Sequence, residues 1–131
     1  MKKRKRFSVI LVFLMLFTVL SVFAGSNSFS VPLGSGYWGG SVSVSSTEAN
    51  ANTYLDPLPP TTNVYAGVSL GIYVLNQSGI LHYSYIGAYE DYITYVGING
   101  YASQGYTCYS SHSSHRGYIN GNEAFQDLNA Y

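Results

Sequence analysis

Apolar and polar residues alternate with a period of two in the middle of the chain. Between residues 64 and 74 every even position is apolar, whereas the odd positions hold tyrosine, glycine or serine. Successive side chains of a β-strand point to opposite faces, so this segment has one aliphatic face and one face that carries tyrosines. We expect residues 64–74 to form a central strand whose aliphatic face lies in the core.

Similar but weaker alternation continues to the end of the chain. Further strands are expected at residues 80–89, 92–98, 101–109, 113–119 and 122–131. Turn signals separate them at residues 76–79, at Glu90 and Asp91, at Asn99 and Gly100, and at Asn120 and Gly121. The last segment would also suit a short helical turn, because Ala124, Phe125 and Leu128 are spaced for one face of a helix.

The region before residue 64 has a different composition. Residues 25–40 are rich in glycine and serine and predict a flexible lead. Residues 41–45 predict a short strand, and residues 52–63, which contain three prolines, predict a surface connection. Together these segments predict an all-β fold, an antiparallel β-sandwich of about seven short strands formed by residues 41–131.

The charges are distributed unevenly along the chain. Five of the six basic residues occupy positions 2–6, directly before an apolar stretch at residues 7–24. A basic start followed by an apolar run predicts a secretory signal peptide of residues 1–24, helical before its removal. If it is not cleaved, it anchors the protein in the membrane with its basic end inside. In both cases we expect a secreted or outward-facing domain.

Removal of that segment leaves an acidic protein. Residues 25–131 contain one basic residue, Arg116, against six acidic residues, a formal net charge of −5. Nucleic acid is excluded as a partner because phosphate binding needs clustered lysine or arginine. Anionic lipid is disfavoured for the same reason, so a membrane is a partner only through an uncleaved N-terminal segment. We expect a neutral polysaccharide or a protein partner, which includes self-association.

Cysteine and histidine occur together in one short segment, CYSSHSSH. Cys108, His112 and His115 are ligand types that zinc prefers, but on a strand the two histidines point to opposite faces. We therefore predict no metal and no cofactor, with these three residues as the candidates if a metal is bound. As the only cysteine, Cys108 is either a small buried apolar residue or part of an intermolecular disulfide.

Catalytic patterns are weak in this sequence. No Gly-x-Ser-x-Gly motif follows an expected strand, and the six acidic residues are too scattered to assign a pair of catalytic carboxylates. We predict that the protein is not an enzyme.

Tyrosine is the most informative residue type for function. All fourteen tyrosines lie within residues 25–131. Tyrosine rings bind sugars or proteins with little loss of side-chain entropy, because the side chain has only two χ angles. We predict an aromatic binding surface formed by Tyr37, Trp38, Tyr65, Tyr73, Tyr83, Tyr85 and Tyr89. The alternative is that these rings form the second half of the sandwich core.

Two segments resemble known secreted proteins. GSGYWGG and YSSHSSHRGY, together with a basic signal peptide, resemble the lactococcin-type β-sandwich bacteriocins of Gram-positive bacteria. The segment GYTCYSSHSSHRGYINGNEAF is similar to the C-terminal ends of small secreted Gram-positive proteins of unknown function. The first resemblance implies a bacteriocin-like antibacterial protein. The tyrosine pattern favours a non-catalytic binding or structural protein of the cell envelope or extracellular matrix, which is our main hypothesis.

Overall fold

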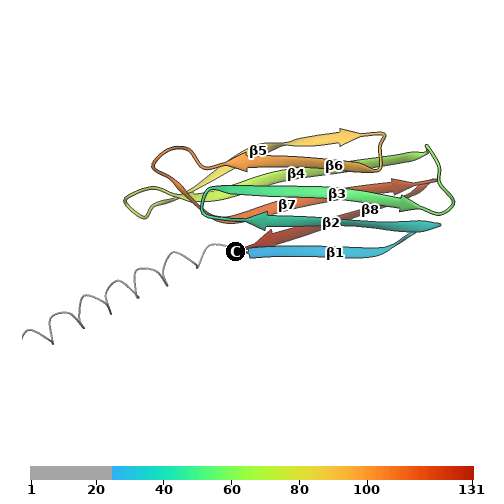
Figure 1. Cartoon of the computed structure of the whole chain (residues 1–131), viewed down its shortest axis with the longest axis horizontal. Helices are drawn as coiled ribbons and strands as arrows, with labels where there is room; N and C mark the ends of the chain where they lie inside the picture. The colour runs from blue at the N-terminus through green and yellow to red at the C-terminus, as the bar shows by residue number, and fades with distance from the viewer. Residues whose placement is uncertain (1–24) are drawn as a thin grey trace, which may run out of the picture.

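The fold is a sandwich of two antiparallel four-stranded sheets (Figure 1). The computed structural model describes residues 25–131, and the predicted signal peptide, residues 1–24, lies outside the described residues. The strands are β1 (Gly25–Leu33), β2 (Gly36–Val44), β3 (Glu48–Pro57), β4 (Val64–Leu75), β5 (Leu81–Asp91), β6 (Tyr95–Tyr101), β7 (Thr107–Ile119) and β8 (Asn122–Ala130). The predicted all-β sandwich is confirmed, with eight strands where about seven were expected.

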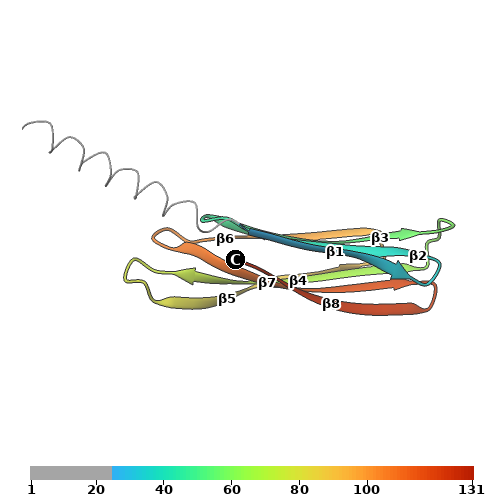
Figure 2. The same ribbon diagram turned by 90° about the horizontal axis from the view of Figure 1, so that it is seen from below.

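The two sheets lie face to face, as the side view in Figure 2 shows. The first sheet has the order β1-β2-β3-β6 and the second has the order β5-β4-β7-β8. The chain changes sheet after β3, after β5 and after β6. Strand β4 pairs with β5 on one side and with β7 on the other, so the prediction of a central strand at residues 64–74 is confirmed.

The core contains the aliphatic face of β4 and the inner faces of its neighbours. All six even-numbered side chains of β4 are buried: Val64, Ala66, Val68, Leu70, Ile72 and Val74. From the opposite sheet, the indole of Trp38 packs edge-on against the ring of Phe29, with 4.6 Å between ring centroids. Gly117 of β7 leaves room for that indole, since a Cβ there would lie 2.6 Å from Trp38 Cε3.

The first expectation that proved wrong is the flexible lead at residues 25–40. These residues form β1 and part of β2, which pair with each other along their whole length. The reason is a second apolar alternation, hidden by serine and glycine, that turns Phe29, Leu33 and Trp38 toward the core. Residues 25–40 therefore belong to the sandwich, which was expected to comprise residues 41–131.

Two expected connections are also placed differently. The predicted surface connection at residues 52–63 is shorter, because residues 52–57 complete β3 and only residues 58–63 lie outside a strand. Asn99 and Gly100 form no turn, because both pair with β3 as part of β6. Pairing with a distant strand has overridden the local turn preference. The expected strand at residues 101–109 is instead a loop, residues 102–106, followed by β7.

The predicted hairpin at Asn120 and Gly121 is confirmed. Both residues have positive φ, and they connect β7 to β8. Strand β8 is regular through Ala130, so the helical alternative for the C-terminal segment is wrong.

A buried polar network joins the two sheets. The Oγ1 hydroxyl of Thr53, in β3, donates a hydrogen bond of 2.8 Å to the carbonyl of Gly67, in β4. Because that proton is used, Thr53 Oγ1 accepts from His115 Nδ1, which lies 2.8 Å away. His115 Nε2 then accepts from the hydroxyl of Ser113 at 2.7 Å. The imidazole of His115 is thus neutral, with both ring nitrogens paired.

Burial of His115 makes its protonation unfavourable. Only 1% of its surface is exposed, and this desolvation lowers the pKa of His115 from 6.5 to about 4. In the unfolded chain the imidazole has its ordinary pKa, so between these two values the unfolded state binds more protons than the folded state. The contribution of His115 to stability is therefore complete above pH 6.5 and is lost as the pH falls toward 4.

We predict that the free energy of unfolding falls by roughly 3 kcal/mol between pH 7 and pH 4 on account of His115 alone. Urea unfolding at several pH values should show a flatter dependence in His115→Gln, which has no titrating group at this position. The control is His112→Gln on the opposite face of β7, which should keep the steep dependence. Equal slopes in the wild type and His115→Gln would contradict the assignment.

A second buried hydroxyl lies two residues away on the same strand. Ser111 is as deeply buried as Ser113, but within residues 25–131 its Oγ is the buried side-chain atom that has no hydrogen-bond partner. An unpaired buried hydroxyl destabilises a fold, whereas a hydroxyl that donates a hydrogen bond supports it.

The same substitution should therefore have opposite effects at these two serines. Ser113→Ala should lower the free energy of unfolding by about 1–3 kcal/mol, because it leaves His115 Nε2 without a donor. Ser111→Ala should leave it unchanged or raise it by up to about 1 kcal/mol. Thermal and urea unfolding of the two variants measure the difference, and an equal loss of stability in both would contradict the network.

Candidate functional surface

On the outer face of the second sheet, which points away from the core, tyrosines lie at both ends of β4 and small residues lie between them. At one end of β4 the rings of Tyr65 and Tyr118 are cross-strand neighbours, and at the other end Tyr73 lies opposite Tyr83. The positions between them on β4 are small: Gly67, Ser69 and Gly71. We call this outer face of β5, β4, β7 and β8 the tyrosine face.

A β-bulge in β5 determines which side chains reach the tyrosine face. Gly71 pairs with Tyr85 but Leu70 pairs with Gly87, so Ile86 is an extra residue in β5. Side chains beyond the bulge change face. Tyr85 therefore lies on the tyrosine face, whereas Tyr89 pairs with Val68 and lies on the opposite side of β5.

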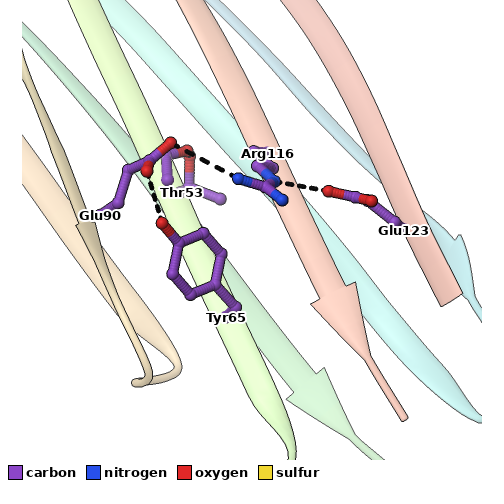
Figure 3. A network of polar contacts seen from close by, with 6 residues as sticks. Thr53, Tyr65, Glu90, Arg116 and Glu123 are labelled. Carbon is purple, nitrogen blue, oxygen red and sulfur yellow. Dashed lines mark hydrogen bonds and ion pairs between the residues drawn. The ribbon is translucent and has the colours of Figure 1, made fainter. Parts of the chain in front are cut away.

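The same bulge brings a carboxylate to the tyrosine face. Beyond it, Glu90 pairs with Gly67 and lies across β4 from Arg116 of β7. Arg116 Nη1 is 3.9 Å from Glu90 Oε1, and Arg116 Nε donates a 2.5 Å hydrogen bond to Glu123 Oε1 on β8. Figure 3 shows the guanidinium between the two carboxylates. The single cation of residues 25–131 is thus paired with two acids.

Aromatic rings hold the guanidinium of Arg116 in place. Its central carbon lies 4.8 Å from the ring centroid of Tyr65 and 5.6 Å from that of Phe125. The Tyr65 hydroxyl donates a hydrogen bond to Glu90 Oε2, and its ring packs edge-on against Tyr92 at 5.0 Å. The result is a preorganised cluster of rings around a neutralised arginine, which we call the Arg116 cluster.

Gly67 allows this cluster to close over β4. A Cβ at position 67 would lie 3.1 Å from Glu90 Oε1 and 3.3 Å from Arg116 Cβ, tighter than ordinary contacts. A larger residue at position 67 would displace the Glu90 side chain by a few tenths of an ångström, so glycine gives the two charged residues their present approach. Thr53, whose hydroxyl holds the Gly67 carbonyl from the core side, is seen behind the cluster in Figure 3.

The ionisation of the cluster follows from its contacts. The hydrogen bond to Glu90 raises the pKa of Tyr65 above its ordinary value of 10.0, since a tyrosinate there would lose the bond and face a negative carboxylate. The hydrogen bond to Glu123 raises the pKa of Arg116. Across the neutral pH range the cluster therefore keeps an uncharged phenol and a charged guanidinium.

Two shallow hollows meet at Arg116. The larger, about 390 Å³, is lined by Asn63, Tyr65, Tyr92, Arg116 and Tyr118. The smaller, about 160 Å³, lies over the small residues in the middle of the sheet and includes Ser69, Ala88 and Ser114 in its lining. Hydroxyl, amide and guanidinium groups in these hollows are hydrogen-bonding partners for a polar, uncharged ligand.

The predicted aromatic residues are divided among several locations. Tyr65, Tyr73, Tyr83 and Tyr85 share the tyrosine face, as the alternation suggested. Trp38 is only 2% exposed, so its ring belongs to the core and to no surface. Tyr37 is 48% exposed but lies on the outer face of the other sheet.

The proposed metal candidates do not converge. Cys108 and His115 point into the core from β7, whereas His112 points outward and lies 2.9 Å from Asn129 Oδ1 through its Nδ1. Burial raises the pKa of the Cys108 thiol, which disfavours the thiolate. Among residues 25–131, no group of three or more His, Cys, Asp or Glu side chains could hold a metal ion.

No protein-family model, curated protein or solved structure matches this chain. The described residues also include no helix that is long and apolar enough to cross a membrane.

Several members of the Arg116 cluster were not predicted. The sequence pattern predicts a turn at Glu90 and indicates no binding role for Arg116, Tyr92 or Phe125. The one signal in the sequence is Arg116 itself, because the single basic residue of an acidic domain is expected to form an ion pair with one of its carboxylates. Which partners it takes depends on the strand order and the bulge, which the local pattern does not contain.

The Tyr65–Glu90 bond gives a direct test of the cluster. In Glu90→Gln we expect the pKa of Tyr65 to fall toward 10, because the negative acceptor has been removed. NMR titration of protein labelled at the tyrosine ring carbons measures this pKa, with Tyr65→Phe identifying the signal. The matched control is Glu123→Gln, which contacts Arg116 but not Tyr65 and should change the pKa far less. An unchanged Tyr65 pKa in Glu90→Gln would contradict the described geometry.

Proposed function

We propose that this is a secreted, non-catalytic binding protein of the cell envelope or extracellular matrix, and that it holds a neutral polysaccharide on the tyrosine face. The observation that carries the proposal is the set of exposed rings on one face of the second sheet. Tyr83 and Tyr85 are 54% and 60% exposed, although each offers a large apolar ring. Exposed rings of this kind stack on the apolar faces of sugar rings, and they lose little side-chain entropy on binding because tyrosine has only two χ angles.

The charges support an uncharged partner. Arg116 is already paired with Glu90 and Glu123, so no free cation on the tyrosine face is offered to a polyanion. The net charge of residues 25–131 is negative, which repels anionic polymers. Hydroxyls of a neutral sugar can instead bind the guanidinium and the carboxylates together, because sugars both donate and accept hydrogen bonds.

The ring pair at the far end of β4 provides the sharpest test of this function. Tyr73 and Tyr83 pack together with 5.0 Å between ring centroids. The double variant Tyr73→Ala, Tyr83→Ala should bind a neutral glucan about tenfold more weakly or worse, because two stacking surfaces are lost. Affinity electrophoresis and calorimetry with soluble, unbranched glucans measure the change. Tyr37→Ala, with a comparably exposed ring on the other sheet, is the matched control and should bind like the wild type.

The salt dependence of binding distinguishes a neutral polysaccharide from a polyanion, and an antibacterial assay tests the bacteriocin-like alternative. Binding to a neutral glucan should change less than about twofold between low and high salt, because few charges are neutralised. Strong binding to a polyanion such as teichoic acid that is abolished by moderate salt would contradict the proposal. Killing of Gram-positive indicator strains by secreted protein that binds no polysaccharide would favour the bacteriocin-like alternative.

A further inference from the structure

The tyrosine face has two groups of rings that are separated along one strand. Tyr65 and Tyr73, both on β4, are eight residues apart, which at about 3.3 Å per residue corresponds to ~26 Å. Tyr92 and Tyr118 join Tyr65 at its end, and Tyr83 joins Tyr73 at the other. A single sugar cannot contact both groups, but an extended chain can.

One row of the surface between the two groups is low. Ala88, Ser69 and Ser114 form one row across β5, β4 and β7, and together they line the smaller hollow. Next to this row, the ring of Tyr83 lies over Gly71, where any side chain would collide with it. No long side chain stands in this row of three strands, so a chain lying along β4 meets no obstruction there.

The ion pair that crosses β4 supplies polar contacts in the same path. Arginine has five N–H donors, and Arg116 uses Nε for Glu123. Its Nη1 is 3.9 Å from Glu90 Oε1, too long for a hydrogen bond. Guanidinium N–H groups beside both hollows therefore remain available to ligand hydroxyls.

Small ligands are usually enclosed in a concave pocket that covers most of their surface. The hollows on the tyrosine face are shallow and open. Tyr65, Tyr92 and Tyr118 line the larger one, whereas Tyr73 lies farther along β4 and lines neither. Such a surface gains affinity by contacting many units of one polymer, because the second contact becomes intramolecular once the first has formed.

We infer that the ligand is one extended, unbranched, uncharged polysaccharide chain that runs along β4 from the Tyr65 group to the Tyr73 group and crosses the Glu90–Arg116 pair between them. The inference rests on the proposed function and specifies the shape of its ligand. Branches would collide with the rings that border the path, and a short oligosaccharide would reach only one group.

The test is the dependence of affinity on chain length. Calorimetry with unbranched β-glucan oligosaccharides of two to eight units should show weak binding for the shortest. Affinity should rise at least about tenfold when the oligomer spans both ring groups, and then level off. Equal affinity per molecule for short and long oligomers would overturn the extended-chain inference and leave the proposed function standing. Absence of binding to every neutral saccharide, polymers included, would instead reject the proposed function.

A variant that fills the low strip gives a second, independent readout. Ser69→Gln places a longer side chain in the low row between the two ring groups. It should weaken binding of the longest oligomers about tenfold while leaving the shortest unchanged, because only a spanning chain crosses position 69. The matched control is Ser28→Gln on the exposed face of β1 in the other sheet, which should change neither. An equal loss for short and long oligomers in Ser69→Gln would contradict a spanning chain.

Discussion

The Thr53–His115 hydrogen bond is the interaction on which both the sandwich and the tyrosine face depend. It is a polar link between sheets whose remaining core is mostly aliphatic. Thr53 also donates to the carbonyl of Gly67, and His115 immediately precedes Arg116. The buried network thus fixes the two backbone positions directly beneath the Arg116 cluster. The binding proposed for this face, which does not enclose the ligand, would need such support, because the rings would have to be held in place before the ligand arrives.

The scarcity of cations shapes the rest of the molecule. With one arginine in residues 25–131, ion pairs can stabilise only one place, and the fold uses that arginine to bridge β5, β7 and β8 across the tyrosine face. Elsewhere, tyrosine rings and glycines take over: Tyr83 lies over Gly71 in the second sheet, and Tyr54 lies over Gly39 in the first. Glycine has no side chain to cover the backbone of its strand, and a tyrosine ring from the neighbouring strand shields that backbone from water. The outer faces of both sheets use this arrangement.

The strands that could be predicted from the sequence are those in which aliphatic residues occupy every second position. The even positions of β4 and the turn at Asn120 and Gly121 were assigned correctly, because each signal is local. Strand β1 is not predicted, because serine and glycine mask its apolar positions, and β6 is predicted only in part, because Asn99 and Gly100 at its end resemble a turn. Strand β1 forms by pairing with β2, which follows it directly in the chain, whereas β6 forms by pairing with the distant strand β3. The tyrosine face was predicted in outline, whereas Trp38 was misplaced because a ring flanked by glycines looks exposed in sequence but fits a core that glycine has opened.

The bulge at Ile86 shows why the Arg116 cluster could not be predicted from the alternation of residues along β5. Strict alternation predicts that Tyr83, Tyr85 and Tyr89 share a face and that Glu90 lies opposite. One inserted residue exchanges the last two, so the tyrosine face loses a ring and gains the carboxylate that meets Arg116. Ile86 itself turns toward Gly100 of the other sheet, where the absence of a side chain makes room for it. The glycine that resembled a hairpin turn is therefore what accommodates the bulge, and through the bulge it determines which charge stands beside the only arginine of residues 25–131.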